Sequence, residues 1–487
     1  MAEEAVSQKG EERWPVPKGD MGSLGVKDLP SIPLGRLYKL GPSIIVLGIA
    51  LGGGELIMWP RLTAQYGAGL MWLAIIGVSL QWFINVELGR YTIATGESFF
   101  TGCSRAWKGF GWFWFASAFI IYMWPGWAAT GATALDVLFG GTGANWKLWA
   151  QVTLVLTLVI LLGGPVVYNS VEKVTMFFMG ATAVILVITI ALVITPGGVK
   201  AMVKGIFFNA GGEWWLPPGI NLFALFGAVI YAGAGSLGNL SYTFAVQQKQ
   251  WGMASHIGRV TSPLTGKLEP VPTAGNVFET SEKNMALWKK WYPVMRNDVT
   301  IYFWLANIIG IVLLAHGALE VLHPAGLVPK GAQIAVTQAN ILAEKAGEFG
   351  RVIFLAMSFF IMYSSQLVAL DLGSRMISEI AYTHTRLHEK YSLRALYTIA
   401  LLILLVFASS ALLFIPAQPF ILFLMGAVLG GFTMAVYSPM LLYINLKFLP
   451  KEIRPSTFIK VGLGIASAVY IIFSIVVILN KVFGVGA

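Results

Sequence analysis

The stretch GPSIIVLGIALGGGE, from Gly41 to Glu55, combines an apolar helical run with a feature that breaks a helix. Three consecutive glycines, Gly52 to Gly54, end the apolar run, and Glu55 follows them directly. Each glycine costs about 1 kcal/mol relative to alanine in a helix interior, so three in succession disfavour a continuous helix. Within hydrocarbon, the backbone groups that such a break frees must line a cavity, because lipid offers no hydrogen bonds. The stretch therefore predicts a membrane-spanning helix that is broken near its middle.

The composition of the whole chain agrees with a membrane environment. Of 487 residues, 56% are hydrophobic and 11% are charged. A soluble globular chain carries about 25% charged residues, so a soluble enzyme of this length is not expected, and so apolar a chain is not disordered either. The single cysteine, Cys103, excludes a disulfide framework and a multi-cysteine zinc site. The fold class expected is an all-α polytopic membrane protein.

Eleven apolar runs are long enough to cross about 30 Å of hydrocarbon as helices. They are continuously apolar, whereas the strands of a membrane barrel alternate between apolar and polar residues. The predicted spans are 41–66, 69–94, 110–139, 147–168, 171–195, 220–245, 298–320, 349–372, 394–415, 419–446 and 457–482.

The basic residues fix the expected orientation. With the N-terminus placed inside, 25 of the 33 Lys and Arg residues fall on the inner side and 8 on the outer side. This bias follows the positive-inside rule and predicts a cytoplasmic N-terminus, an external C-terminus and an odd number of spans, in the plasma (inner) membrane. The net charge of +10 is therefore a topology signal, and nucleic acid is not an expected partner.

The chain divides into four parts. Residues 1–40 form a polar cytoplasmic tail, and its acidic residues argue against a cleavable signal peptide. Residues 41–195 and 196–446 hold five predicted spans each, the second part with a cytoplasmic loop at 246–297, and 447–487 add helix 11. The loop is expected to be either a small ordered cap or a flexible segment. The acidic residues before Gly22 are Glu3, Glu4, Glu11, Glu12 and Asp20.

The sixth predicted span is interrupted in the same way as the first. Its sequence from Leu225 to Asn239 reads LFGAVIYAGAGSLGN, with Gly233, Gly235 and Ser236 near the middle. Breaks five spans apart are expected of a 5+5 inverted repeat, and secondary transporters bind substrate at such paired breaks. The alternative is that these glycines only allow helices to pack closely. The substrate-binding candidates at the two breaks are Gly52, Gly53, Gly54, Glu55, Gly233, Gly235, Ser236 and Asn239.

Two acidic residues lie deep in predicted spans. Glu55 follows the triple glycine, and a carboxylate at this depth costs a few kcal/mol, so it is a functional candidate. It is a candidate cation ligand and proton carrier, unless it lies in a shallower, solvated vestibule. Asp371 is the second coupling candidate, although Arg375 at i+4 makes a local ion pair the simpler interpretation. Glu87 and Arg90 are also expected to form a structural pair.

Two tryptophans lie near the middle of the third predicted span. Trp124 and Trp127 flank Pro125-Gly126 and are three residues apart, on one face of the predicted helix. A lipid-facing or packing role is the simpler interpretation, and the alternative is that they form the wall of a substrate pocket or offer cation–π contacts. The five histidines of the chain form no cluster, so no tight transition-metal site is expected.

The sequence resembles the Nramp family of divalent-metal transporters from about Leu40 to Lys481. The first span is similar to the family's Gly-Pro-Gly, Asp-Pro-Gly-Asn and Gln-Phe-Gly stretch, and similar short matches occur in four further helices. The resemblance implies a LeuT-type fold with eleven or twelve spans. The matching positions are Gly41-Pro42, Gly54, Ala64-Gln65-Tyr66-Gly67, Gln81, Leu88-Gly89, Thr95-Gly96, Tyr168, Glu172-Lys173, Asn239-Leu240, Ala245, Gln248 and Ser364-Ser365 through Gly373.

The departures from the family pattern fall on its functional residues. The family's metal-binding Asp aligns with Gly52 and its Asn with Glu55. The methionine of its sixth helix is Ser236 and the histidine is Gly238. The acidic proton carriers of its third helix align with the two tryptophans. Without the sulfur ligand a soft metal is disfavoured, and a harder, partly hydrated cation is expected at Glu55, Ser236 and Asn239.

The expected function is secondary active or facilitative transport of a divalent metal cation by alternating access, and proton symport is a weaker expectation. The alternative is a transporter of a small amino or organic acid on the same fold. The chain has no P-loop, no H-E-x-x-H motif and no nucleophile–base constellation, so neither ATP-driven transport nor an enzyme is expected. No cofactor is expected beside the transported cation. The lipid bilayer is the expected partner, and the sequence leaves the oligomeric state open.

Overall fold

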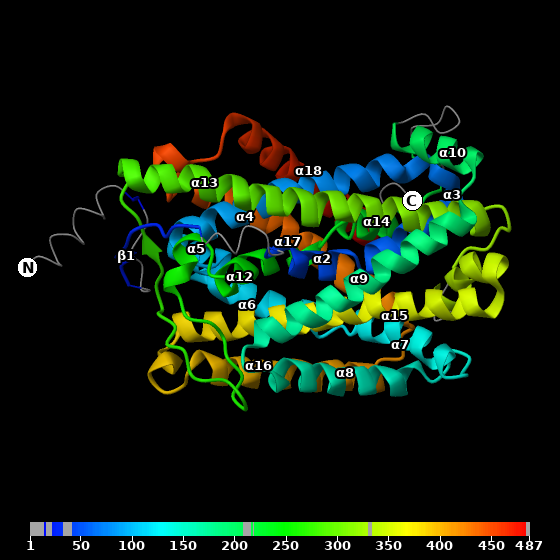
Figure 1. Cartoon of the computed structure of the whole chain (residues 1–487), viewed down its shortest axis with the longest axis horizontal. Coiled ribbons are helices and arrows are strands. Elements are labelled where there is room, and N and C mark those ends of the chain that lie inside the picture. Colours follow the sequence, from blue (N-terminus) through cyan, green and yellow to red (C-terminus); the bar gives the residue numbers. More distant parts are fainter. Residues whose placement is uncertain are drawn as a thin grey trace, which may run out of the picture.

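The apolar runs form helices that lie side by side along the longest axis of the protein (Figure 1). The computed structural model describes residues 14–15, 22–32, 41–207, 216–217, 219–329 and 334–483. The five acidic residues before Gly22 lie outside the described residues. Within hydrocarbon only a helix satisfies all its own backbone groups, which is why long apolar runs adopt this form.

The first part of the chain holds two interrupted helices and three continuous ones. The first predicted span is α2 followed by a short π-helical turn, Gly54–Met58, and α3. The third predicted span is split into α6 and α7. The helices are α2 (Ser43–Ala50), α3 (Trp59–Tyr66), α4 (Met71–Thr95), α5 (Phe99–Ala106), α6 (Gly109–Tyr122), α7 (Gly126–Leu138), α8 (Trp146–Gly163) and α9 (Val167–Val193).

The second part repeats the interruption in its first span, which is divided into α11 and α12 with a 3-10 turn, Ser236–Leu240, between them. The helices are α10 (Pro196–Ile206), α11 (Leu222–Ile230), α12 (Ser241–Gln248), α13 (Glu282–Asp298), α14 (Ala306–Gly317), α15 (Ile334–His384), α16 (Leu393–Phe414), α17 (Pro419–Lys447) and α18 (Thr457–Phe483).

Eight segments of the described residues are long and apolar enough to cross a membrane. One of them, Ser43–Thr95, contains the first two predicted spans, and the broken third and sixth spans are too short in each piece to be counted. The structure is therefore compatible with eleven predicted crossings. It confirms the all-α membrane fold and the breaks in spans 1 and 6.

Two expectations about helix ends were wrong. The inner loop predicted at 246–297 contains α13, which continues through a π-helical stretch, Val299–Leu305, into α14. Its polar face hid this extension, because the spans were recognised by continuous hydrophobicity alone. The boundary predicted at 168–171 lies instead at Gly163-Gly164-Pro165, where α8 ends and the chain turns into α9.

The segment between α12 and α13 is the ordered alternative of the two expected for the inner loop. A two-residue strand in it, β2 (Asn276–Val277), pairs in parallel with β1 (Gly25–Val26) of the N-terminal region. Arg259 forms an ion pair with Glu269 at 2.6 Å. The segment therefore covers the end of the helix bundle at which the described N-terminal residues lie (Figure 1).

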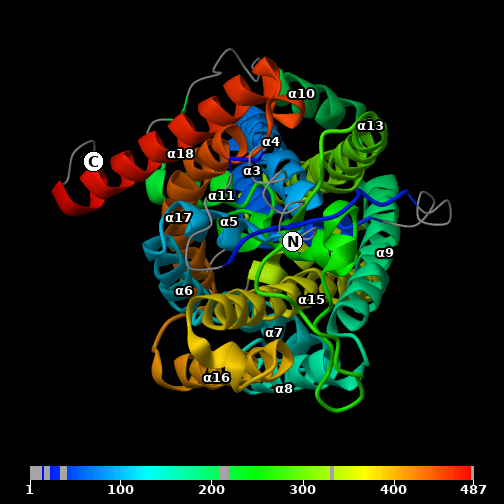
Figure 2. The ribbon, with the colours of Figure 1, turned by 90° about the vertical axis from the view of Figure 1, so that its left-hand side faces the viewer.

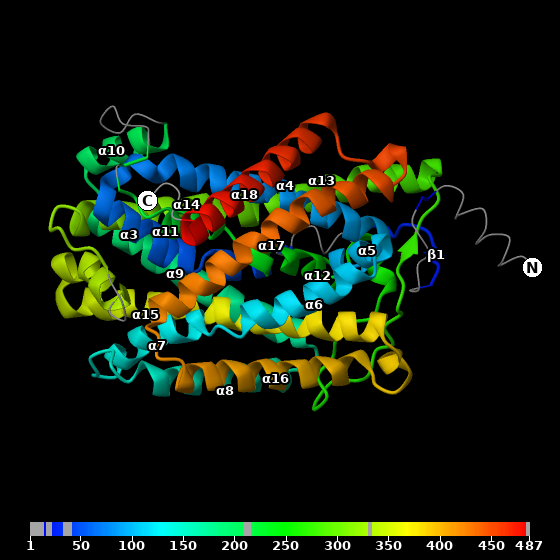
Figure 3. The same ribbon diagram turned by 180° about the vertical axis from the view of Figure 1, so that it is seen from behind.

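Burial separates central from peripheral helices. The apolar window of α15 is 72% buried and that of α17 is 67% buried, whereas those of α8 and α9 are 28% buried. A helix that stays apolar where it is exposed faces lipid. The end-on view shows α8, α9, α16 and α18 at the periphery (Figure 2), and the view from behind shows α18 crossing α17 obliquely (Figure 3). The broken helices contact α15 and α17 in the interior.

Candidate functional site

The break of the first span is closed by the carboxylate that follows it. The helix α2 ends at Ala50, and the backbone leaves the helical region at Leu51, whose ψ is 71°. Oε2 of Glu55 accepts a hydrogen bond from the Gly52 amide at 2.9 Å. Oε1 of Glu55 is buried and has no hydrogen-bond partner among protein groups. A fully buried carboxylate thus caps its own helix break and keeps one oxygen unused.

The triple glycine allows three close approaches at this break. A Cβ on Gly53 would lie 1.9 Å from the ring of Phe423, and one on Gly54 would lie 1.4 Å from the carbonyl oxygen of Tyr231. A Cβ on Gly52 would lie 2.7 Å from Oγ of Ser365. Since Tyr231 begins the interruption of the sixth span, the two breaks are in direct contact. Residues larger than glycine would separate them.

Two serines of α15 satisfy the last turn before the break. The Ser364 and Ser365 hydroxyls donate to the carbonyl oxygen of Gly48 at 2.9 Å and 3.2 Å. Both hydroxyls also lie within 3.1 Å of the carbonyl oxygen of Ile361. The serines therefore tie α2 to α15 at the level of the break, through four oxygen atoms that lie close together.

The break of the sixth span is held by one side chain of α4. Gly235 and Ser236 have φ values of 54° and 48°, the left-handed region that interrupts a helix. Oε1 of Gln81 accepts from the Gly235 amide at 2.8 Å, and its Nε2 donates to the Ile230 carbonyl at 2.9 Å. A Cβ on Gly233 would lie 2.7 Å from the same Gln81 oxygen. Gln81 thus satisfies a freed donor and a freed acceptor of this break.

Asn239 lies at this break, but neighbouring side chains engage its amide. Its Nδ2 donates to Gln81 at 3.1 Å and to the Tyr437 hydroxyl at 3.0 Å, and its Oδ1 accepts from Asn85 at 2.8 Å. The Tyr437 hydroxyl in turn donates to the carbonyl oxygen of Ser236 at 2.9 Å. The structure gives Asn239 a structural role at the break, and its role as a metal ligand stays a prediction.

Two hydroxyl groups at the same break are buried without a hydrogen-bond partner. They belong to Tyr231 and Ser236. Both lie beside α17, where a Cβ on Gly430 would be 1.9 Å from Oγ of Ser236 and one on Gly426 would be 3.8 Å from the Tyr231 hydroxyl. The two glycines of α17 therefore leave room for these hydroxyls, and the role of Ser236 as a ligand stays a prediction.

The third span contains a break that the sequence analysis did not predict. The helix α6 ends at Tyr122, α7 begins at Gly126, and Pro125 between them has a ψ of 46°, which is not helical. Trp124 therefore lies in the interruption and Trp127 in the first turn of α7, so they do not share one face of a continuous helix. The signal was the Pro125-Gly126 pair, which marks helix interruptions.

Both tryptophans line one small cavity beside the two central breaks. The Trp127 ring lies 6.0 Å from the Tyr231 ring and 6.1 Å from the Phe423 ring, between centroids. Tyr122 and Trp124 line the same cavity, and their hydroxyl and indole N–H groups are buried without partners. The expectation that the tryptophans form the wall of a pocket agrees with this position, and a bound substrate there stays a prediction.

The two other acids that the sequence analysis singled out, Asp371 and Glu87, are each paired with an arginine. Asp371 accepts from Nε of Arg375 at 2.9 Å and from the Tyr397 hydroxyl at 2.7 Å. Glu87 and Arg90 form the expected pair at 2.8 Å. Asp371 is thus held by an ion pair, as the simpler interpretation expected, and its role in proton coupling stays a prediction.

A further acid, Glu379, was not singled out from the sequence. It lies about one turn before the end of α15. Polar residues are common at the ends of membrane helices, so this position did not mark Glu379 as a functional candidate. One of its carboxylate oxygens accepts from the Ser98 and Thr101 hydroxyls, at 2.8 Å for Thr101. Beside it, Glu97 is paired with Arg105 at 2.6 Å. Among the described residues, no group of three or more His, Cys, Asp or Glu side chains is placed to hold a metal ion.

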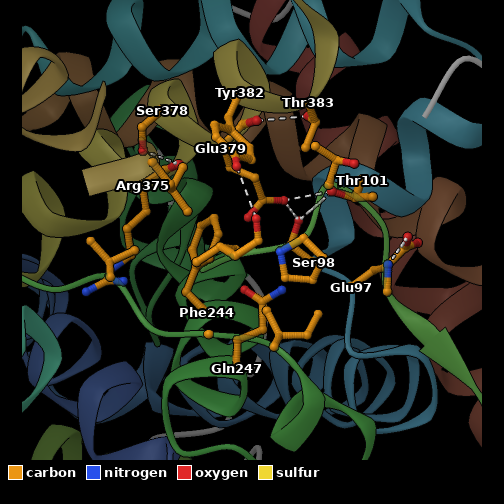
Figure 4. Close-up of a pocket in the computed structure, with 18 of the residues that line it drawn as sticks. Glu97, Ser98, Thr101, Phe244, Gln247, Arg375, Ser378, Glu379, Tyr382 and Thr383 are labelled. Atoms are coloured by element: carbon orange, nitrogen blue, oxygen red, sulfur yellow. Dashed lines mark hydrogen bonds between the residues drawn. The ribbon is translucent and has the colours of Figure 1, made fainter. Parts of the chain in front are cut away.

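Figure 4 shows the cavity that Glu379 faces, at the end of the bundle covered by the inner loop. Phe244 and Gln247 of α12 approach from one side, and Tyr382 and Thr383 of α15 from the other. The cavity joins α12 to the last turns of α15, at the end of the bundle where the described N-terminal residues lie.

Comparisons with known proteins identify the type of fold. No family model matches the chain, and no curated protein matches its sequence. Among solved structures it is similar to the manganese transporter of Eremococcus coleocola, with a TM-score of 0.63 at 13% identity over 95% of this chain and 92% of that one. It is also similar to a nucleobase-cation-symport-1 family transporter with bromovinylhydantoin bound, with a TM-score of 0.53 at 13% identity over 91% of this chain and 94% of that one. A third match is MhsT in complex with L-phenylalanine, with a TM-score of 0.50 at 16% identity over 91% and 98%.

These similarities confirm the expected LeuT-type fold of an integral membrane protein, and they confirm the resemblance to the Nramp-type manganese transporter at the level of the fold. The three matched proteins are a manganese transporter, a transporter with a hydantoin bound and a protein in complex with an amino acid. The fold alone is therefore shared by transporters of quite different substrates.

Proposed function

We propose that this protein is a transporter that carries a hard divalent cation across the membrane, with the cation bound where the breaks of α2–α3 and α11–α12 meet. The observation that carries the proposal is the unused Oε1 of Glu55, a buried carboxylate oxygen without a partner at the first break. Burying an unpaired carboxylate is costly, and a bound cation removes that cost.

The other groups at the breaks are suited to a hard cation. The Ser236 hydroxyl is buried without a partner, and the interrupted backbone supplies carbonyl oxygens. No sulfur is contributed by the aligned position, which argues against a soft metal. Because one carboxylate and few other ligands converge, the cation would keep part of its water shell, as Mg²⁺ does at most protein sites. The cation is the cargo, so neither a resident cofactor nor an enzymatic reaction is part of the proposal.

Alternating access would proceed by movement of one repeat against the other around the breaks. Glu55 would supply the charge that attracts the cation. The Gln81 network would keep the second break in shape, and the two serines of α15 would connect α2 to the opposite repeat.

Calorimetry on the purified protein tests the cation site. Wild type should release or absorb heat on titration with Mg²⁺, and Glu55→Gln should abolish it, because the substitution removes the charge and keeps the shape. Glu269→Gln, at a surface ion pair, is the matched control and should bind as wild type does. Mn²⁺, Ca²⁺ and Fe²⁺ titrations define the selectivity. A wild type that binds none of the four ions, or a Glu55→Gln variant that binds normally, contradicts the proposal.

Uptake into liposomes tests transport and its coupling. Protein-containing vesicles should accumulate Mg²⁺, and Glu55→Gln vesicles should not. A pH-sensitive dye inside the vesicles reports proton symport as an acidification that accompanies uptake. Uptake without any change of internal pH would identify a uniporter or a different coupling ion.

The second candidate function is transport of a small amino or organic acid. It is favoured by the cavity at the third break, where the Tyr122 hydroxyl and the Trp124 indole N–H are buried donors without acceptors. A carboxylate or carbonyl of a substrate would satisfy both, and Trp127 would contact its apolar body. This arrangement requires no metal.

A thermal-shift screen of amino and organic acids separates the two functions. If a solute binds at the third break, it should stabilise wild type, and Tyr122→Phe should weaken the effect about tenfold, because a buried hydrogen bond is lost. Tyr168→Phe, which removes a buried hydroxyl without a partner at the start of α9, is the control. A flat screen together with Mg²⁺ binding removes the second candidate.

A further inference from the structure

A cleft lined by basic and aromatic side chains lies on the outer surface of the helix bundle, away from the breaks. We call it the basic groove; it has a volume of about 500 Å³ and lies between the inner end of α4, α13 and the turn that joins α17 to α18. Figures 1 and 3 both show this turn beside the first part of α13. The side chains that matter here are Arg90, Lys289, Tyr292, Arg296, Arg454 and Phe458.

The positive charge of the basic groove is not neutralised by the protein. Lys289 and Arg296 are exposed and lie seven residues apart, on one face of α13. Nε of Arg454 donates to the carbonyl oxygen of Leu449 at 2.8 Å. The ion pairs formed among the described residues involve none of these three cations. The acid that lines the groove, Glu452, is exposed and leaves a net positive charge.

One cation of the groove, Arg90, is already paired within the protein and lies at the bottom of the groove. Arg90 is buried and is paired with Glu87 at 2.8 Å, and its Nη1 donates to the Ile453 carbonyl at 2.8 Å. Its guanidinium lies 4.2 Å from the centroid of the Tyr292 ring, measured from Cζ. This stack fixes Tyr292 and the turn before α18 relative to α4. The three remaining cations therefore surround a rigid surface.

The groove opens onto the apolar face that surrounds the bundle. Phe458 at its edge is 67% exposed, and Val461 and Ile465, one and two turns further along α18, are 56% and 52% exposed. Such side chains face acyl chains in a membrane protein. Trp82 and Tyr292 lie at the boundary between the apolar and the basic surface, as aromatic residues do at the membrane–water interface.

We propose that the basic groove binds the anionic headgroup of a phospholipid in the leaflet on the side of the N-terminus. Lys289, Arg296 and Arg454 would contact the phosphate, and the acyl chains would lie along Phe458 and the exposed face of α18. Basic pockets between membrane helices on the cytoplasmic side suit such headgroups, and the distribution of Lys and Arg assigns this end of α13 to that side. The proposal does not depend on which substrate is transported.

Native mass spectrometry of the purified full chain tests the proposal, with phosphatidylglycerol and phosphatidylcholine as probes. Wild type should retain phosphatidylglycerol in preference to phosphatidylcholine. The double variant Lys289→Gln, Arg296→Gln should bind phosphatidylglycerol about 30-fold more weakly, since each interfacial cation contributes about 1 kcal/mol. Arg454→Gln should weaken it by about fivefold by the same estimate.

A charge-matched control separates this site from general surface attraction. Arg386→Gln, Lys390→Gln removes two exposed cations at the same end of the bundle, beside α15 and α16. This control should retain phosphatidylglycerol, and all variants should unfold at the wild-type temperature in lipid-free detergent. Equal losses in both double variants, or unchanged binding in both, overturn the proposal. Displacement of phosphatidylglycerol by millimolar inorganic phosphate would also overturn it, because the groove would then recognise free phosphate.

Discussion

The two helix breaks at the centre of this protein are alike in sequence and unlike in how they are satisfied. At the second break, Gln81 engages a freed amide and a freed carbonyl, and Asn239 and Tyr437 complete the network. At the first break, Glu55 caps the Gly52 amide from within the same helix and keeps Oε1 unpaired.

The difference indicates a division of labour. A network in which the donors and acceptors of Gln81 and Asn239 are engaged holds one backbone conformation, which suits a structural support. A buried charge with a free oxygen is stable only when something else completes it. We therefore expect the second break to hold the backbone in one conformation. A ligand bound at the first break should raise the free energy of unfolding.

The largest effect is expected where the two breaks touch. A Cβ on Gly54 would lie 1.4 Å from the Tyr231 carbonyl oxygen, and backbone has to move to admit it. Gly54→Ala should therefore destabilise the protein by about 3 kcal/mol or more, measured as a fall in the thermal unfolding temperature. Gly180→Ala in α9, where a Cβ meets nothing within 4 Å, is the control and should be neutral or slightly stabilising. If both variants unfold alike, the breaks are not in tight contact.

The second prediction tests the network around Gln81 at the second break. Gln81→Leu leaves the Gly235 amide and the Ile230 carbonyl buried without partners, at a cost of about 3 kcal/mol in the free energy of unfolding. Gln338→Leu is the control. Both polar atoms of the Gln338 side-chain amide are buried without partners, so this substitution removes no hydrogen bond. Thermal unfolding should separate the two variants clearly. Equal destabilisation would show that the network around Gln81 does not support the break.

Much of this comparison was visible in the sequence. The glycines at 52–54 and at 233–235 predicted both interruptions, because glycine in a membrane helix has a large and local energetic cost. The positions of Glu55 and Asp371 were also recognised, since charged residues are rare at that depth. Which of them is paired depended on the direction of each side chain and on how the neighbouring helix packs. In the folded protein, Asp371 accepts a hydrogen bond from Tyr397, and Glu55 accepts one from the Gly52 amide.

The missed features share a physical reason. The break at Trp124-Pro125 lies in an aromatic run whose hydrophobicity hides it, and α13 is polar on one face although it continues into a span. Gln81 was matched only as a motif position, because its partners, Gly235 and Ile230, are more than 140 residues away. Side chains that satisfy a distant backbone break leave no local pattern in the sequence.

The third prediction concerns the serines that join the first break to α15. Either hydroxyl can donate to the Gly48 carbonyl, so Ser364→Ala and Ser365→Ala should each cost only a few tenths of a kcal/mol by this compensation. The double variant leaves the carbonyl without either donor and should cost about 1–2 kcal/mol in unfolding free energy. Thermal unfolding of the three variants measures the coupling, and Ser409→Ala with Thr398→Ala in α16 is a control pair. Strict additivity of the two serine effects would contradict the shared role.

The smallest effect is expected far from both breaks, at the ion pair of Arg259 with Glu269 in the loop between α12 and α13. The hydrogen bond from Arg259 lowers the pKa of Glu269 below its ordinary value of 4.5. A depressed pKa in the folded state gives stability that is present above pH 4.5 and is lost as the pH falls through the lower, folded-state value. Since both side chains are about one-third exposed, the loss should be below about 1 kcal/mol. Unfolding temperatures measured from pH 7 to pH 3 should show this loss in wild type and not in Glu269→Gln. A fall in stability that begins well above pH 4.5 and survives in Glu269→Gln cannot come from this ion pair and would contradict the prediction.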